Sequence, residues 1–394
     1  MALVLDFENI MMQQILPYLV VSATIAAMLG TAVHVIHCKR DIRAAVGWLG
    51  LIWFAPVVGV LLYWTFGINR IKRKAQNVFS NSKPGEIPST LRAIQPEYLP
   101  DQLGQDWKVL SQLACLSERI TSQPLIGGNR VSPLVNGDQA YPAMLKAIQE
   151  ARHSLALSTY IFDNDIWGQR FAKALGQAAA RGASVRVLID DIGARYSSPS
   201  ICRVLKQEGV TVARFMRSLK PWRFRYYNLR NHRKILVADG RIGFTSGMNI
   251  RAGNVLGEKP DHPIQDLHFR LDGPIVAELQ RIFADDWAFT TGENLAGPKW
   301  FPVIRETGQA VARGIADGPD EDFDKLRSVL LGALSCAKHS ICIACPYFLP
   351  DKELTAGLKI AAMKGLRVKI LLPEKNNLKM VHWAAWAGLD ELLQ

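Results

Sequence analysis

The stretch Asn231-His232-Arg233-Lys234-Ile235-Leu236-Val237-Ala238-Asp239 is the part of the sequence from which the fold is inferred, because it spaces three reactive side chains as H-x-K-x4-D. Side chains alternate along a strand, so a strand here turns His232 and Lys234 to the same face. An imidazole beside an ammonium suits covalent attack on a phosphate, because the imidazole is the nucleophile and the ammonium holds the phosphoryl oxygens. A nearby carboxylate, here Asp239, can orient an imidazole and fix its tautomer. The alternative is a polar strand end that carries these residues without a function.

Residues around this stretch complete a longer pattern. Asp239-Gly240-Arg241 is followed by Ser246-Gly247-Met248-Asn249-Ile250. Together with the residues from Tyr227 onward, this pattern resembles the HKD motif of the phospholipase D superfamily and, within it, of the bacterial cardiolipin synthases. That family usually has a Gly-Gly or Gly-Ser pair with Asn two residues later. The resemblance implies that Asn249 helps to hold the phosphate, and that the hydroxyl of Ser246, which stands where the family usually has Gly, contacts it.

Composition narrows the choice of partners. The 394 residues are 49% hydrophobic and 21% charged, which is ordinary for a folded protein. The net charge of +12 favours partners that carry phosphate, either nucleic acid or an anionic membrane. The six cysteines show no disulfide or zinc spacing, and the pair Cys342 and Cys345 is interpreted as buried structural thiols. The resemblance implies that no metal is required, the sequence shows no acidic metal cluster, and no cofactor is expected.

Residues 1–70 predict a membrane segment. Two apolar runs over about 15–36 and 44–66 are each long enough to cross a bilayer, and they predict a two-helix transmembrane hairpin with both termini on one side. Three cations lie between the runs and four follow the second, so the positive-inside rule leans only slightly toward a cytoplasmic catalytic part. The segment is similar to the N-terminal part of cardiolipin synthases. The alternative is a pair of buried helices in a soluble protein.

The rest of the chain predicts an α/β fold with an internal repeat. Residues 71–125 are interpreted as a linker with helical pieces that pack on the main domain, and from about 126 the order strand, helix, strand predicts a mixed sheet flanked by helices. The segment from His153 through Gly182 recurs from His339 through Gly365, at offsets of 186 and 183 residues. We therefore predict a first phospholipase D-like domain over 126–300, which contains the HKD motif, and an incomplete second one over 301–394.

The repeat predicts a second HKD motif outside this sequence. His232 lies 50 residues beyond Gly182, so its counterpart is expected 50 residues beyond Gly365, near position 415, whereas the sequence ends at Gln394. We expect that the chain is truncated before the second motif. The alternative is that the second histidine comes from another subunit, as in a homodimer.

The resemblance also implies a mechanism. In this family one histidine attacks phosphorus and a second histidine, facing it, protonates the leaving alcohol and then activates the incoming one. His232 is thus expected to be the nucleophile, Lys234 to neutralise phosphoryl charge, and Asp239 to orient a histidine, either that of its own motif or the one in the opposite half. Another family segment is matched by Asp266 and His268, of which His268 is interpreted as structural.

The predicted function is that of a membrane-bound phosphatidyltransferase of the cell inner membrane. It makes cardiolipin from two phosphatidylglycerol molecules through a phosphatidyl-histidine. Phospholipase D-type hydrolysis, with water as acceptor, and an inactive phospholipid-binding fragment are the alternatives. The cations and aromatic residues over 214–234 suit an amphipathic membrane-contacting surface or a nucleic-acid groove, and the alternative is a solvated basic face with a few core aromatics. Because the hairpin would hold the site at a bilayer, we expect anionic membrane lipids as partners and no nucleic acid.

Overall fold

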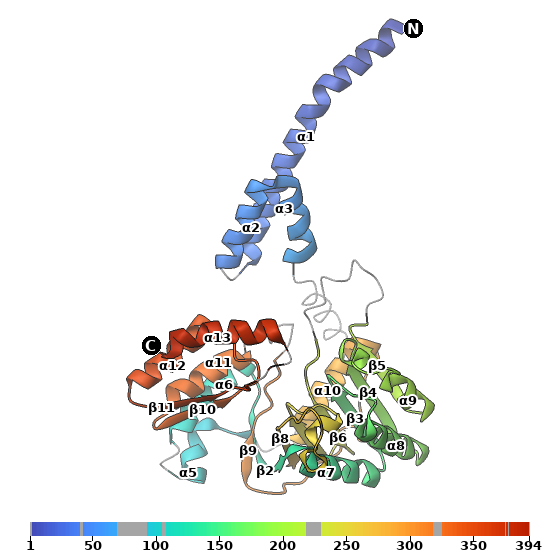
Figure 1. The fold of residues 1–394 in the computed structure, drawn as a ribbon, viewed down its shortest axis with the longest axis vertical. Helices are drawn as coiled ribbons and strands as arrows, with labels where there is room; N and C mark the ends of the chain where they lie inside the picture. The colour runs from blue at the N-terminus through green and yellow to red at the C-terminus, as the bar shows by residue number, and fades with distance from the viewer. Residues whose placement is uncertain are drawn as a thin grey trace. The chain divides into compact units, whose positions relative to one another are not determined.

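The computed structural model describes residues 2–39, 42–68, 93–104, 108–217, 230–317, 325–374, 376 and 378–393. The described residues form two compact units, which are treated separately (Figure 1). One unit holds the N-terminal helices, and the other holds the sheets with the helices that cover them.

In the described part of the N-terminal unit the structure has three helices rather than the two that the sequence predicts. They are α1 (Ala2–Cys38), α2 (Ile42–Phe54) and α3 (Pro56–Leu62), and a π-helical turn (Tyr63–Gly67) continues α3. Proline cannot donate the backbone hydrogen bond of a helix interior, and Pro56 instead begins a new helix after Ala55, whose backbone is not helical. The prediction of one continuous span over 44–66 is therefore wrong.

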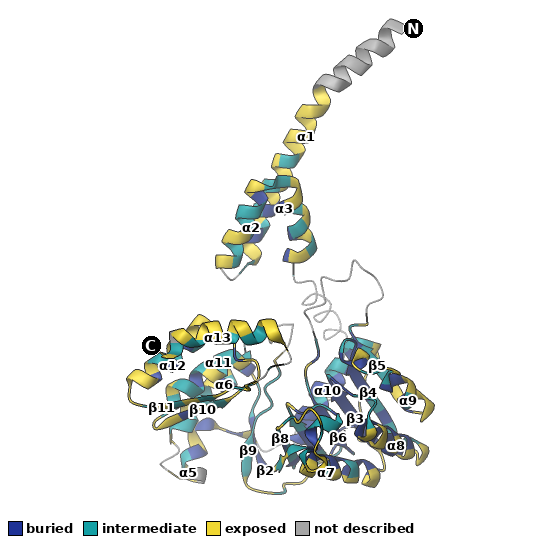
Figure 2. Cartoon of the chain, viewed as in Figure 1, coloured by how far each residue is buried: buried dark blue, intermediate teal, exposed yellow. Residues whose placement is uncertain are grey.

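One helix among the described residues is long and apolar enough to cross a membrane, namely Ile15–Cys38. The two helices that replace the predicted second span are shorter than a crossing requires. From Ile15 to the end of α3, most large apolar side chains are exposed (Figure 2). Exposed apolar helices of this kind are typical of a membrane-associated segment.

The larger unit is built on a mixed sheet with the order β1-β2-β8-β7-β6-β3-β4-β5, in which β9 pairs with β2, and on a second sheet of two strands. Its strands are β1 (Ala93–Ile94), β2 (Leu125–Val135), β3 (Ser154–Thr159), β4 (Ser184–Asp190), β5 (Thr211–Phe215), β6 (Ile235–Ala238), β7 (Ile242–Ser246), β8 (Leu267–Asp272), β9 (Ala310–Ala312), β10 (Ser340–Ala344) and β11 (Arg367–Leu371). Its helices are α5 (Leu99–Leu103), α6 (Lys108–Thr121), α7 (Asn136–Glu150), α8 (Ile166–Ala180), α9 (Ile201–Gln207), α10 (Val276–Thr291), α11 (Lys325–Cys336), α12 (Lys352–Met363) and α13 (Lys379–Leu393).

Helices cover both faces of the large sheet, so its central strand β6 is buried on both sides. Leu236 packs into the hydrophobic cluster under α7, α8 and α9, whereas its neighbour Val237 packs into the cluster under α10. This alternation is the period of 2 expected of a strand. The predicted α/β fold is confirmed.

The internal repeat is visible in the backbone. β3 and β4 pair in parallel, and so do β10 and β11. In both pairs the carbonyl of the residue just before the first strand accepts a hydrogen bond from the first residue of the second strand. Ser184 N donates to His153 O at 2.9 Å, and Arg367 N donates to His339 O at 3.1 Å. Gly182 and Gly365 both have a positive φ, of 95° and 87°, one residue beyond the caps of α8 and α12. This left-handed conformation favours glycine and lets the chain leave each helix for the next strand.

The predicted linker contains a helix that packs on the larger unit, as expected of its helical pieces. α6, from this linker, packs against α11. Cys342 is exposed and Cys345 half-buried, so the interpretation of both as buried thiols is wrong. The boundary between the two phospholipase D-like domains at 300/301 stays a prediction.

Candidate active site

The HKD stretch enters the sheet at the edge where four strand ends meet. β6 lies between β3 and β7 and is antiparallel to both, so the start of β6 lies beside the ends of β3 and β7. β8 starts at the same edge, because it is antiparallel to β7. His232 and Lys234 precede β6, Tyr160 follows β3, Asn249 follows β7, and Asp266 precedes β8.

The structure brings His232 and Lys234 together on one face, as their spacing predicts. Lys234 Nζ lies 3.1 Å from His232 Nδ1 and donates to the His232 carbonyl oxygen at 2.6 Å. Arg233 points the other way and pairs with Asp286 of α10, its Nη1 lying 2.8 Å from Asp286 Oδ1. Asn231 also donates to Asp286, at 2.9 Å. The residues on either side of His232 thus anchor this segment to α10.

The electrostatics of the pair suit nucleophilic attack. Burial, and then the Lys234 ammonium, lower the pKa of His232 to about 4, although part of the residue is exposed to solvent. Burial lowers the pKa of Lys234 to about 7, against the opposing charges of Asp266 and Asp190. The imidazole is therefore neutral at pH 7 and keeps a lone pair, while the ammonium loses its proton far more readily than an ordinary lysine.

Asn249 supports the site from the end of β7. Its Oδ1 accepts a hydrogen bond from Ile161 N at 3.0 Å, which ties the loop after β7 to the loop after β3. Its amide nitrogen makes no hydrogen bond to another described residue and can donate to a phosphate oxygen. Its expected role as a phosphate ligand is compatible with this geometry.

Ser246 is held away from that role. Its Oγ lies 2.6 Å from Nδ1 of the buried His268 and accepts a hydrogen bond from Met248 N at 3.2 Å. The hydroxyl is therefore already engaged inside the protein, and the phosphate contact expected of Ser246 has no geometric support. His268, interpreted from sequence as structural, is only 2% exposed, and burial lowers its pKa to about 4.

Asp239 does not reach His232. It lies beyond the opposite end of β6, where Oδ1 accepts hydrogen bonds from His153 N and Ser154 N at 2.7 and 2.9 Å, and Oδ2 accepts one from Arg152 N at 2.9 Å. The carboxylate thus fastens the start of β3 to the end of β6. The orienting role expected of Asp239 has no geometric basis for the histidine of its own motif.

Two further residues face the pair and were given no role from sequence. Asp266, before β8, carries a charge that raises the pKa of Lys234. The ring of Tyr160 lies 4.7 Å from the His232 ring and 5.5 Å from Lys234 Nζ, measured to its centroid. Nothing in the HKD spacing reveals Tyr160, and only its position directly after a buried strand could have indicated it.

Replacing Tyr160 with leucine is expected to lower kcat about tenfold with a smaller change in KM, because the ring packs on the imidazole and attracts the ammonium. Tyr160→Phe keeps the ring and should stay within about threefold of the parent. Steady-state kinetics on both variants measures the difference. A loss in Tyr160→Phe as large as in Tyr160→Leu would show that the hydroxyl, not the ring, matters.

The basic and aromatic segment is only partly described, since residues 218–229 lie outside the described part of the chain. Among the described cations of this segment, Arg214, Arg230 and Arg233 pair with Asp191, Asp190 and Asp286, whereas Arg217 is exposed. These three guanidinium groups therefore serve the fold rather than a lipid or nucleic-acid surface.

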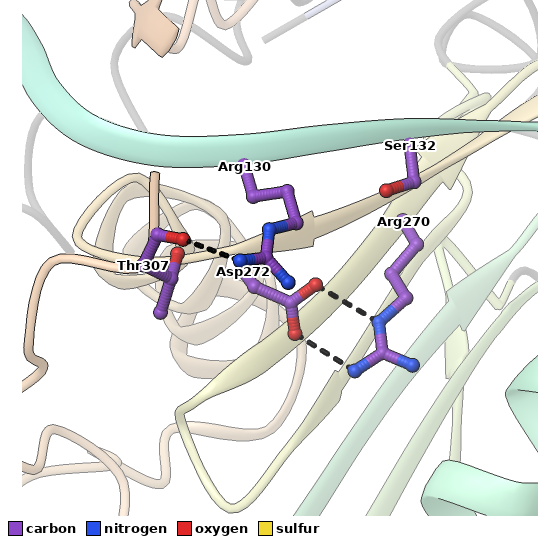
Figure 3. Close-up of a pocket in the computed structure, with 5 residues that line it drawn as sticks. All are labelled: Arg130, Ser132, Arg270, Asp272 and Thr307. Carbon is purple, nitrogen blue, oxygen red and sulfur yellow. Dashed lines mark hydrogen bonds and ion pairs between the residues drawn. The ribbon is translucent and has the colours of Figure 1, made fainter. Parts of the chain in front are cut away.

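A cavity of about 490 Å³ lies at the other end of β2 and β8 from Asp266 (Figure 3). It is lined by Arg130, Ser132, Arg270, Asp272 and Thr307. Arg270 makes two hydrogen bonds of 2.9 Å to Asp272, and Arg130 donates to the Thr307 carbonyl oxygen at 2.9 Å. Arg130 pairs with Asp272 in the strand register, whereas the site end of these strands is Val135 beside Leu267. The cavity is therefore separate from the His232 site.

Comparison with known proteins decides the family. The model of the cardiolipin synthase, PLD-like domain family matches residues 144–287 and 330–394. The chain belongs to this family. The phospholipase D-nuclease N-terminal family matches residues 26–67. Within the family, cardiolipin synthase from Geobacillus thermodenitrificans (strain NG80-2) is 32% identical over 364 residues, which cover 90% of this chain and 71% of that protein.

Other relatives agree with this assignment. Cardiolipin synthase A from Pseudomonas aeruginosa (strain LESB58) is 31% identical over 360 residues, covering 90% of this chain and 72% of the relative. Among solved structures, phosphatidylserine synthase from Haemophilus influenzae Rd KW20 has a TM-score of 0.49 at 13% identity and covers 71% of this chain and 72% of that one. Function is assigned from the cardiolipin synthase family alone.

Proposed function

We propose that this cardiolipin synthase family member transfers a phosphatidyl group between two phosphatidylglycerol molecules, which yields cardiolipin and glycerol. The observation that carries the proposal is the contact of a neutral imidazole, His232, with the Lys234 ammonium at the sheet edge. The test is product analysis on phosphatidylglycerol vesicles with the parent chain and His232→Ala. Cardiolipin marks transfer, phosphatidic acid marks hydrolysis, and retained vesicle binding without turnover marks a binding fragment.

His232 would act as the nucleophile in two displacements. In the first, a ring nitrogen bonds to phosphorus, the bond from phosphorus to the glycerol oxygen breaks, and glycerol leaves with a proton from a general acid. In the second, the hydroxyl of another phosphatidylglycerol loses a proton and bonds to phosphorus, and His232 is released. Splitting the exchange in this way replaces one difficult step with two easier ones. A second histidine, supplied by a later part of the protein or by a homodimer partner, is the proposed acid.

Lys234 would change partners when substrate enters. A charged ammonium only donates hydrogen bonds, so its contact with Nδ1 places the ring proton on Nε2. Nε2 has a lone pair for attack only when the proton is on Nδ1. A phosphate that draws Lys234 onto its own oxygens frees Nδ1 to take that proton. Binding of the substrate and activation of the nucleophile are coupled in this way.

The activity is expected to depend on pH through both groups. His232 must be neutral, which requires a pH above its pKa of about 4, and Lys234 must be charged, which requires a pH below its pKa of about 7. kcat/KM should therefore be greatest between these values and fall about tenfold per pH unit on either side. The measurement uses short-chain phosphatidylglycerol in zwitterionic mixed micelles, which keep the surface pH near that of the buffer.

The variant Lys234→Arg isolates the alkaline limb. A guanidinium stays charged throughout this range, so the variant should keep a lower plateau of activity that no longer falls above pH 7. An unchanged alkaline limb in Lys234→Arg would assign that limb to another group.

We also propose the bacterial inner membrane as the location, with the catalytic part on the cytoplasmic side and anionic phospholipids as partners. The proposal rests on family membership and on the apolar helix Ile15–Cys38. A substrate that lies in the bilayer needs an enzyme that stays beside it.

A further inference from the structure

We infer that α2 and α3 form a re-entrant hairpin, which enters a single leaflet of an anionic bilayer from the catalytic side and returns to the same side. α2 has 13 residues. α3 has 7 residues, and the π-helical turn that continues it has 5. At 1.5 Å per residue each arm extends about 20 Å, whereas crossing the hydrocarbon core takes about 30 Å. Each arm thus matches one leaflet with its interface and not a whole bilayer.

The chain reverses direction between the two arms. Ala55 has φ −138° and ψ 73°, which breaks the helix. A side chain at Gly59 would lie 2.5 Å from the Leu51 carbonyl oxygen and 2.8 Å from Ile52 Cα, so the two helix backbones touch there. Further from the turn, the rings of Trp48 and Tyr63 lie 5.4 Å apart. Each of these contacts joins residues at similar sequence distances before and after Ala55. This is the pattern of two antiparallel helices and not of one kinked helix.

Hydrogen bonds fix the returning arm against α1. Tyr63 Oη lies 2.7 Å from His34 Nδ1, and Trp64 Nε1 donates to Thr31 Oγ1 at 3.0 Å. Thr31 and Tyr63 are buried, so these bonds satisfy polar groups that hydrocarbon would otherwise leave unpaired. Thr31 and His34 lie close to Cys38, the last residue of α1. The end of α3 therefore lies beside the end of α1 from which α2 departs (Figure 1).

The turn of the hairpin presents an apolar surface that no described residue covers. Its side chains are between 55% and 93% exposed, namely Trp53, Phe54, Val57, Val58 and Leu61. They surround the reversal at Ala55, which is the part of a re-entrant hairpin that lies deepest in the lipid. Hydrocarbon chains are the partner that such a surface fits, because it carries no charge and, apart from the indole N–H of Trp53, no hydrogen-bonding side-chain group.

The distribution of charge agrees with this geometry. The first cation of the chain is Lys39, and only Asp6 and Glu8 are charged before it. Two cations (Lys39, Arg40) precede α2 and a third, Arg43, lies in its first turn, and four (Arg70, Lys72, Arg73, Lys74) follow α3 in the sequence. Two separate spans would place these groups on opposite sides of the membrane. A re-entrant hairpin places all of them opposite the acidic N-terminus, where the positive-inside rule expects them and where anionic headgroups attract them.

Native Cys38 allows a direct test on the full chain. It is exposed and ends α1, and the exposed Cys342 reports the side of the catalytic part. Sealed right-side-out spheroplasts and inverted vesicles are treated with a membrane-impermeant maleimide, and labelled peptides are identified by mass spectrometry. One cysteine added ahead of Met1 marks the N-terminus. Where Cys38 fails to react even after permeabilisation, Arg43→Cys replaces it.

We expect external reagent to label only the added N-terminal cysteine, and inverted vesicles to expose Cys38 and Cys342 together. External labelling of Cys38 with Cys342 protected would overturn the hairpin in favour of two spans. External labelling of both, with the N-terminus protected, would support the hairpin and refute the cytoplasmic placement of the catalytic part. The failure of the hairpin and the failure of the proposed location are thereby distinguished.

Discussion

Replacing His232 with alanine is expected to reduce cardiolipin formation by about 10³-fold or more, the usual scale of loss when a covalent nucleophile is removed. Alanine has no nitrogen that could bond to phosphorus, and nothing else among the described residues at this edge pairs a neutral imidazole with an ammonium. His232 lies partly exposed ahead of β6, so its removal should leave the melting temperature nearly unchanged. Lipid mass spectrometry on phosphatidylglycerol vesicles measures cardiolipin and glycerol in the same sample.

His153→Ala is the matched control. His153 is exposed, its side chain makes no hydrogen bond to another described residue, and it lies at the opposite end of the sheet from His232. The control should retain parental activity. Cardiolipin from His232→Ala at the parental rate would refute the nucleophile assignment. Absence of product from parent and variant alike, with vesicle binding retained, would mean that the second histidine is needed from elsewhere and that this chain by itself only binds phospholipid.

The same experiment separates transfer from hydrolysis. Both reactions pass through a phosphatidyl-histidine, and they differ only in whether a lipid hydroxyl or water attacks it. Cardiolipin without phosphatidic acid would support the transferase. Phosphatidic acid as the main product would support the hydrolase, and a rise in cardiolipin as the phosphatidylglycerol content of the vesicles increases would show that the two acceptors compete.

The part of the site that follows from local geometry could be predicted from the sequence. Side-chain alternation sufficed to bring His232 and Lys234 together, and the structure places them 3.1 Å apart although β6 itself begins only at Ile235. The spacing between His232 and Asp239 likewise allowed the distance between these two side chains to be predicted. Seven residues of extended chain cover about 23 Å, so a carboxylate seven positions beyond His232 in a strand lies at the far end of it. Grouping the three residues in one motif conceals that distance.

The remaining features depend on contacts between distant parts of the chain. Tyr160 meets His232 because β3 and β6 are neighbours in the sheet, and 72 positions of sequence separate them. The second apolar run is predicted to be one span, because hydropathy does not show where the chain reverses its direction. Its reversal depends on Gly59 fitting against Leu51, a contact that appears only once the two helices are folded.

Asp239→Ala is expected to destabilise the larger unit by about 2–3 kcal/mol, because three backbone N–H groups lose a charged acceptor. Water can reach two of these donors, which keeps the loss below the full value for three buried bonds. In a unit of this size the melting temperature should fall by about 5 °C, as measured by thermal unfolding in detergent. Asp261→Ala, at an exposed position, is the control and should leave the melting temperature unchanged.

The variant Asp239→Asn distinguishes a structural role of the Asp239 carboxylate from a catalytic one. The amide keeps an oxygen that can accept from His153 N and Ser154 N and loses only the bond to Arg152 N, so the stability loss should shrink to about 1 kcal/mol. Its activity per folded molecule, measured well below the melting temperature, should match the parent within about twofold. A residue that orients a histidine through its negative charge would behave in the opposite way, with intact stability and activity reduced by orders of magnitude. The ratio of the two losses in this one variant therefore decides whether the aspartate of the motif belongs to the chemistry or to the joint between β3 and β6.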